Sequence, residues 1–156
     1  MKFIKEVMPY IVIFISVMLI RTFIITPVIV SGSSMDSTLK DGEILILKKY
    51  DKTYERFDIV VFDYNNSKLV KRVIGLPGET VKYIDGKLYI NEEEVSDPFA
   101  SLTHDYELNI TIPDNYYFVL GDNRTNSTDS RLIGLVDVKD INGTTNFSLW
   151  PIKRVK

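Results

Sequence analysis

The N-terminal apolar segment constrains this chain most, because few folds can accept it. Between Val7 and Ile20 all but two residues are apolar. As a helix these 14 residues rise only about 21 Å, whereas the 19 residues of 7–25 rise about 28 Å, close to the roughly 30 Å of a bilayer hydrocarbon core. We therefore predict a transmembrane anchor over residues 7–25.

Basic residues set the expected orientation of the anchor. Lys2 and Lys5 precede it, Arg21 lies near enough to its far end to reach headgroups, and Thr26-Pro27 breaks it. The positive-inside rule then places residues 1–6 in the cytoplasm and 26–156 outside. We expect a single-pass protein of the cell (plasma) membrane with an extracytoplasmic domain.

A cleavable signal peptide is the alternative interpretation of this segment. The lysines would form its charged region, and Val30-Ser31-Gly32 would be the small-residue cleavage site. Cleavage there would leave Ser33 and Ser34 at the extreme start of the mature chain, where a side chain is hard to hold in place. A buried core helix is disfavoured because the segment is apolar on all sides.

The overall composition excludes several classes of function. The 156 residues suffice for an anchor and one domain, and the net charge of −2 comes from interleaved acidic and basic residues, so no nucleic-acid partner is expected. The chain has no cysteine and a single histidine, His104. Thiolate chemistry is therefore impossible, multi-histidine metal sites are excluded, and metal catalysis is disfavoured.

After the anchor, short β-branched runs alternate with turn residues, which predicts a mainly β domain with an antiparallel sheet or barrel. The clearest hairpin turns at Asp85-Gly86, a pair suited to a type I′ turn. The acidic segment 91–108 is expected to be an exposed excursion of the sheet. The expected strands are 43–47, 58–62, 68–74, 80–84, 87–90, 109–112 and 116–120.

Two segments offer a nucleophile and a base. Ser34 lies among small and hydroxylated residues in 30–39, where backbone amides could form part of an oxyanion hole, although a flexible linker has the same composition. In strand 68–74 the two-residue period gives Lys71 apolar neighbours. Burial disfavours an ammonium, so Lys71 could become a neutral amine able to activate a serine, although most strand lysines point to solvent.

The loop 121–131 is dense in charge and is expected to be braced internally. Bidentate ion pairs there could hold Ser127 and Ser130 in fixed places. The charged residues are Asp122, Arg124, Asp129 and Arg131. A solvated surface loop is the alternative.

Together the three segments resemble type I signal peptidases, in the short Gram-positive-like form. The family pattern Ser-Met-x-Pro-Thr-Leu corresponds to residues 34–39, with Ser37 in place of proline. Lys-Arg-x-x-Gly-x-Pro-Gly-Asp/Glu corresponds to 71–79, and Gly-Asp-Asn-Arg-x-x-Ser-x-Asp-Ser-Arg corresponds to 121–131 without a mismatch.

The resemblance implies a membrane-bound endopeptidase that removes signal peptides from preproteins and needs no cofactor. It implies Ser34 as nucleophile, Lys71 as general base and Ser127 as the hydroxyl that orients the Lys71 amine. It further implies the ion pairs Arg72–Asp122 and Asp129–Arg131. The oxyanion would be held by the Ser34 amide and by the Gly32 amide or a neighbouring hydroxyl.

The resemblance also implies that small residues occupy the first and third positions before the cut. The expected walls of their pockets are Val28, Val30, Met35, Leu45 and Val70. The apolar stretch 23–30 is expected to dip into the outer leaflet and contact lipid.

Two other functions remain open. A Ser/His peptidase would use His104 as its base in place of Lys71. A non-catalytic β domain would bind exported polypeptides at the membrane without cutting them. Cleavage of a preprotein, and its loss on replacing either dyad residue, would separate these hypotheses.

Overall fold

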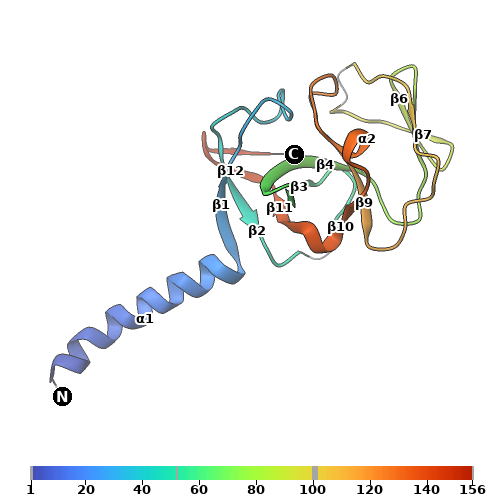
Figure 1. The fold of residues 1–156 in the computed structure, drawn as a ribbon. Helices are drawn as coiled ribbons and strands as arrows, with labels where there is room; N and C mark the ends of the chain where they lie inside the picture. The colour runs from blue at the N-terminus through green and yellow to red at the C-terminus, as the bar shows by residue number, and fades with distance from the viewer. Residues whose placement is uncertain (1, 52, 100–101, 156) are drawn as a thin grey trace.

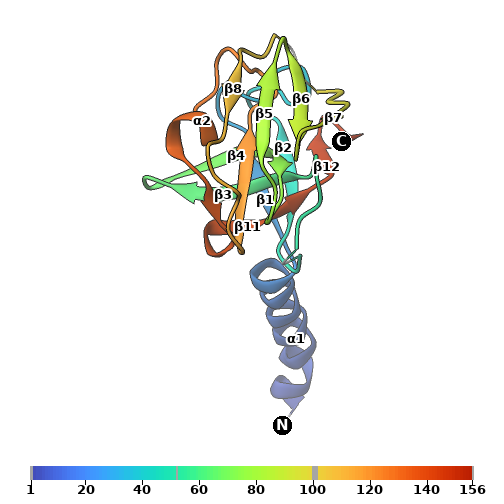
Figure 2. The same cartoon turned by 90° about the vertical axis from the view of Figure 1, so that its right-hand side faces the viewer.

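A computed structural model describes residues 2–51, 53–99 and 102–155. One long helix, α1 (Lys2–Phe23), projects from a body built almost entirely of strands (Figure 1, Figure 2). Met1, the first residue of the predicted cytoplasmic stretch 1–6, lies outside the described residues. Within the described part of the chain, Lys5–Phe23 is the one helix long and apolar enough to cross a membrane, and none of it is buried in the body.

The helix ends two residues before the predicted end of the anchor at residue 25. Ile25 instead begins strand β1 (Ile25–Ile29), where it pairs with Lys48. The last carbonyls of a helix lack partners within it. Here the Thr26 hydroxyl donates to the Arg21 carbonyl at 2.8 Å, and this side-chain cap accompanies the change from helix to strand.

The strands of the described residues form two antiparallel sheets, which confirms the predicted mainly β class. The larger sheet contains β1 with β2 (Ile44–Lys48), β3 (Ile59–Tyr64), β4 (Ser67–Gly75), β9 (Tyr116–Leu120), β10 (Val136–Asp137), β11 (Ile141–Thr145), β12 (Phe147–Trp150) and β13 (Lys153–Arg154). The smaller sheet contains β5 (Val81–Ile84), β6 (Lys87–Ile90), β7 (Glu93–Val95) and β8 (Tyr106–Glu107). Two short helices, α2 (Ser130–Ile133) and η1 (Val138–Asp140), follow β9.

The larger sheet is an open barrel. Its strands follow the order β4-β3-β11-β2, and β1 adds to the far side of β2. Among the described strands, β1 pairs only with β2, and the first half of β4, residues 67–71, pairs only with β3. An opening therefore separates β1 from the first half of β4. Apolar side chains fill the inside of this curved sheet: Val30, Met35, Leu39, Leu45, Leu47, Ile59, Val61, Val70 and Val155.

The structure corrects two of the predicted elements. Residues 109–112 form no strand. Among the described residues, only Ile112 of this segment forms backbone–backbone hydrogen bonds, with Gly78 and Glu79, and its side chain enters the core. The segment 91–108 is not only an exposed excursion, because β7 and β8 pair with the hairpin of β5 and β6. Its residues 100 and 101 lie outside the described part. The hairpin turn itself is as predicted, with positive φ at Asp85 and Gly86.

Candidate active site

Lys71 and Ser34 meet at the open edge of β4. The Lys71 amine donates to the Ser34 hydroxyl, with Nζ and Oγ 2.7 Å apart, and to the Val70 carbonyl at 2.9 Å. Lys71 is only 1% exposed. A buried lysine in contact with a serine hydroxyl is the arrangement that nucleophile activation by an amine requires.

The protein environment makes the Lys71 amine unusually easy to deprotonate. Burial lowers its pKa to about 8, although the carboxylates of Asp129 and Asp122 act in the opposite direction. Removing an ammonium from water disfavours its charged form. A sizeable fraction of Lys71 is therefore neutral at mildly alkaline pH.

Ser34 is held by both the core and the loop 121–131. The next residue, Met35, is 1% exposed and belongs to the core of the open barrel. The Asn123 amide donates to the Ser34 carbonyl at 3.0 Å, and the Asn123 side chain donates to the Ser33 carbonyl at 3.1 Å. These contacts make the serine segment an ordered part of the site and not a flexible linker.

Two ion pairs brace the loop. Arg72 donates to both carboxylate oxygens of Asp122, at 2.8 and 2.6 Å, and Arg131 donates to both oxygens of Asp129, at 2.8 and 2.7 Å. Burial alone would raise the pKa of Asp129, but hydrogen bonds from Arg131 and the Gly121 amide outweigh it and hold that pKa below its usual value. Asp129 therefore stays ionised beside the dyad.

The sequence had led us to expect an ion pair of Arg124 within the loop, but its carboxylate partner is Asp97, and within the loop its Nε donates to the Gly121 carbonyl at 3.0 Å. Its guanidinium donates to Asp97 at 2.7 Å, to the Tyr83 hydroxyl at 2.9 Å and to Thr103 at 3.1 Å. Asp97 follows β7, so this buried cluster ties the loop to the smaller sheet. No sequence motif marked Asp97, which lies in the segment predicted to be exposed.

Ser127 lies next to the dyad without the predicted bond to Lys71. A Cβ atom added to Gly121 would come within 2.2 Å of Ser127 Oγ and 2.4 Å of the Ser34 carbonyl oxygen, so both serines pack against this glycine. The hydrogen bonds that Lys71 Nζ forms with described residues go to Ser34 and Val70. The Ser127 hydroxyl oxygen is buried, and a hydrogen bond from this hydroxyl helps to lower the pKa of Asp129.

The sequence left the second oxyanion donor open between the Gly32 amide and a neighbouring hydroxyl. The Gly32 amide donates to Asp41 Oδ1 at 2.7 Å, so this donor is already engaged. The Ser33 hydroxyl is better placed to contribute, since it accepts from Asn126 Nδ2 at 3.1 Å and keeps its own proton. Asp41 and Asn126 were not singled out from the sequence, because an isolated polar residue in a loop carries no periodic signal.

A cavity of about 240 Å³ adjoins the dyad. It is lined by Ser31, Gly32, Ser33, Ser34, Leu69, Lys71, Asn126 and Thr128. The predicted pocket walls do not line it. Val30, Met35, Leu45 and Val70 are buried in the core beneath it, and Val28 packs against that core.

The alternative base and a metal centre find no support in the described residues. His104 is exposed, in the segment preceding β8. The described part of the chain contains no group of three or more histidine and carboxylate side chains that could hold a metal ion.

The fold and the site define a hydrolase of the signal peptidase class. The family model described as "Signal peptidase, peptidase S26" matches residues 2–150. The chain therefore belongs to this family of peptidases.

Individual relatives agree with the family. The chain is 42% identical to signal peptidase I of Bacillus licheniformis over 157 residues, covering 89% of this chain and 84% of the relative. It is 34% identical to signal peptidase I of Streptococcus pneumoniae over 197 residues, covering 99% and 96%. A crystal structure of a signal peptidase I from Enterococcus faecalis is 39% identical, with a TM-score of 0.55 over 59% of this chain and 96% of that one.

Proposed function

We propose that this protein is a membrane-anchored serine endopeptidase that removes N-terminal signal peptides from exported preproteins, with Ser34 as nucleophile and Lys71 as general base. The observation that carries the proposal is the 2.7 Å contact between Lys71 Nζ and Ser34 Oγ, made by an amine that is 1% exposed. Family membership supports the reaction class.

In the proposed reaction, neutral Lys71 removes the Ser34 proton as the serine oxygen attacks the peptide carbonyl carbon. The protonated amine then gives its proton to the leaving nitrogen, and an acyl-enzyme remains. A water molecule, deprotonated by the same amine, releases the signal peptide. Ser127, which packs against Gly121 beside Ser34, would orient the amine in this proposal.

The oxyanion needs hydrogen-bond donors that already point at it. The Ser34 amide supplies one donor in this proposal. The Ser33 hydroxyl, oriented by Asn126, supplies the second, because the Gly32 amide is committed to Asp41.

The opening between β1 and β4 supports a peptide substrate in an extended conformation. A strand lying there would meet the outer edge of β1 on one side and residues 67–71 of β4 on the other. Exposed sheet edges bind extended peptides through main-chain hydrogen bonds. The scissile bond would then lie beside Ser34, and the cavity of about 240 Å³ there would take small side chains.

The anchor supports a substrate that is still in the membrane. Helix α1 would cross the bilayer with Lys5 on the cytoplasmic side and Arg21 near the outer headgroups. The domain that follows would then face the same leaflet from which a signal peptide emerges.

Purified full-length protein in detergent, incubated with a preprotein, tests the proposal. We expect one cut after a small residue, abolished by Ser34→Ala and by Lys71→Ala. Lys87→Ala is the matched control, because Lys87 is a half-exposed lysine of the smaller sheet. Cleavage that persists in Lys71→Ala, or preprotein binding without any cleavage by the wild type, would contradict the proposal.

A further inference from the structure

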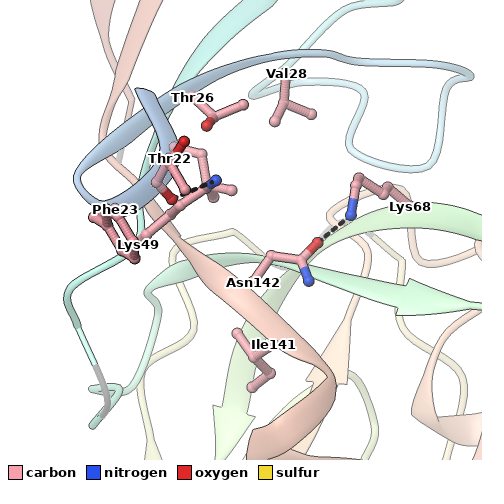
Figure 3. Close-up of a pocket in the computed structure, with 9 residues that line it drawn as sticks. Thr22, Phe23, Thr26, Val28, Lys49, Lys68, Ile141 and Asn142 are labelled. Carbon is pink, nitrogen blue, oxygen red and sulfur yellow. Dashed lines mark hydrogen bonds between the residues drawn. The ribbon is translucent and has the colours of Figure 1, made fainter. Parts of the chain in front are cut away.

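A second and larger cavity, of about 460 Å³, lies where the anchor helix joins the β body (Figure 3). Thr22 and Phe23, at the end of α1, line it together with Thr26 of β1. Lys68 of β4 and Asn142 of β11 line the facing side. No catalytic group lies in this cavity, so the proposed reaction does not account for it.

This cavity follows the same opening of the barrel as the active-site cavity. Lys68 lines the larger cavity, and the next residue, Leu69, lines the cavity at the dyad. A peptide that rises from the membrane beside α1 and reaches Ser34 would therefore pass the larger cavity first.

On one side of this cavity, Lys49 shows how a helix end is stabilised. Its ammonium donates to the Thr22 carbonyl at 3.2 Å (Figure 3) and also to the Arg21 carbonyl at 3.5 Å. These carbonyls belong to the last turn of α1, which carries the negative end of the helix dipole. Two residues after this helix ends, the chain is already the extended strand β1.

On the facing side, the ammonium of Lys68 has one N–H group that can still donate a hydrogen bond. It donates to the Asn142 side chain (Figure 3) and to Asp63 at 2.6 Å. The Asn142 amide in turn donates to the other Asp63 oxygen at 2.8 Å. An ammonium has three donors, and these two bonds hold it in place while leaving one for a further acceptor. The Lys68 side chain is 50% exposed, so an incoming group can reach it.

We propose that the larger cavity receives the carboxyl end of the substrate's signal helix, and that Lys68 caps its last carbonyls as Lys49 caps those of α1. The inference rests on the proposed function. The substrate would change from helix to strand at the same level as the enzyme's own chain. Lys71 lies three positions after Lys68 on β4, or about 10 Å along the strand, so the favoured substrates have a helix that ends about three residues before the cut.

A comparison of two substrates tests this proposal. One is a preprotein with its complete signal helix, and the other is a short peptide that begins three residues before the cut. We expect Lys68→Met to lower kcat/KM about threefold to tenfold for the preprotein and to leave the short peptide unaffected. Lys68→Arg, which keeps the charge, should retain most of the activity. Lys87 lies on the smaller sheet and also has a single carboxylate partner. Lys87→Met should leave kcat/KM unchanged for both substrates.

The outcomes separate this inference from the proposed function. Wild-type protein that cleaves neither substrate would overturn the proposed function itself. An equal loss on both substrates, or no loss on either, would overturn the role of Lys68 alone. A Lys68→Met defect seen in vesicles containing phosphatidylglycerol but absent in detergent micelles would assign the cavity to an anionic lipid headgroup, and would also overturn it.

Discussion

Arg72 and Asp122 form an ion pair from which solvent is fully excluded. Both side chains are 0% exposed, and the guanidinium meets the carboxylate through two hydrogen bonds. The Phe99 ring covers the guanidinium, with its centroid 3.4 Å from Arg72 Cζ. Because Arg72 directly follows Lys71 on β4, the pair fixes the strand that carries Lys71 to the loop that holds Ser34.

Removing one partner of this pair should lower the free energy of unfolding. Asp122→Asn leaves the guanidinium buried without its counter-charge, and we expect a loss of about 3 kcal/mol in the free energy of unfolding. Replacing Arg72 by Met and Asp122 by Leu together should restore part of that loss. Denaturant titration in detergent measures both. A loss below about 0.5 kcal/mol for Asp122→Asn, the size expected at an exposed pair, would contradict this view of the pair.

The reaction should depend on pH through Lys71. With a pKa of about 8, the amine is mostly protonated at pH 6, so kcat/KM should rise about tenfold per pH unit up to pH 8 and then level off. Initial rates with a short peptide at constant ionic strength provide the profile. A rate that is constant from pH 6 to 9 would exclude a titrating amine as the base.

The same shift in pKa has a consequence for stability, with a defined sign. The folded pKa of Lys71, about 8, lies below the 10.5 of the unfolded chain, so between these values the unfolded state binds more protons. Stability should therefore rise with pH across this window, by roughly 3 kcal/mol in all. Unfolding titrations at pH 7.5 and 10 measure the rise, and Lys71→Met should remove its contribution.

Gly121 should accept no side chain. A methyl group there would meet the Ser127 hydroxyl and the Ser34 carbonyl at less than 2.5 Å, and the Ser34 backbone cannot move without shifting the proposed nucleophile. We expect Gly121→Ala to reduce kcat/KM at least about a hundredfold, the effect typical of an active-site displacement near 1 Å. Gly75→Ala is a useful comparison, because its close neighbours are core side chains away from the dyad. Wild-type rates for Gly121→Ala would refute the close contact.

The second oxyanion donor can be identified by mutation. If the Ser33 hydroxyl holds the oxyanion, Ser33→Ala should lower kcat about a hundredfold and leave KM nearly unchanged. Asn126→Ala should have a smaller effect in the same direction, because Asn126 only orients that hydroxyl. An unchanged kcat in Ser33→Ala would return the role to a backbone amide.

Ser34 and Lys71 could be proposed from the sequence chiefly through the resemblance to type I signal peptidases, because composition alone does not select one serine or one lysine. The apolar period around Lys71 indicated burial, and the charged residues of 121–131 indicated bracing, which the structure provides through Asp122 and Asp129. The partners that come from distant loops carried no such signal. Asp97 and Asp41 become recognisable only when the fold brings them to Arg124 and Gly32.

Some strands also lacked a readable pattern. Strand β11 contains Asn142-Gly143-Thr144, which has no apolar alternation, yet it pairs with β2 and β3. Gly143 is needed there, since a Cβ atom would come within 1.9 Å of the Lys48 carbonyl oxygen. Ser37 likewise has a φ of 93°, which proline cannot adopt, so the departure from the family pattern at this position fits the local backbone.

A single residue, Ile24, connects α1 to β1, so no flexible linker separates the helix from the β body. In a bilayer, the same short connection would fix the distance of Ser34 from the lipid surface. Longer or shorter lipid acyl chains would change the tilt of α1. The β body would tilt with the helix, and Ser34 and Lys71 would move with it. Membrane thickness would thus help to determine which peptide bond of the substrate reaches Ser34.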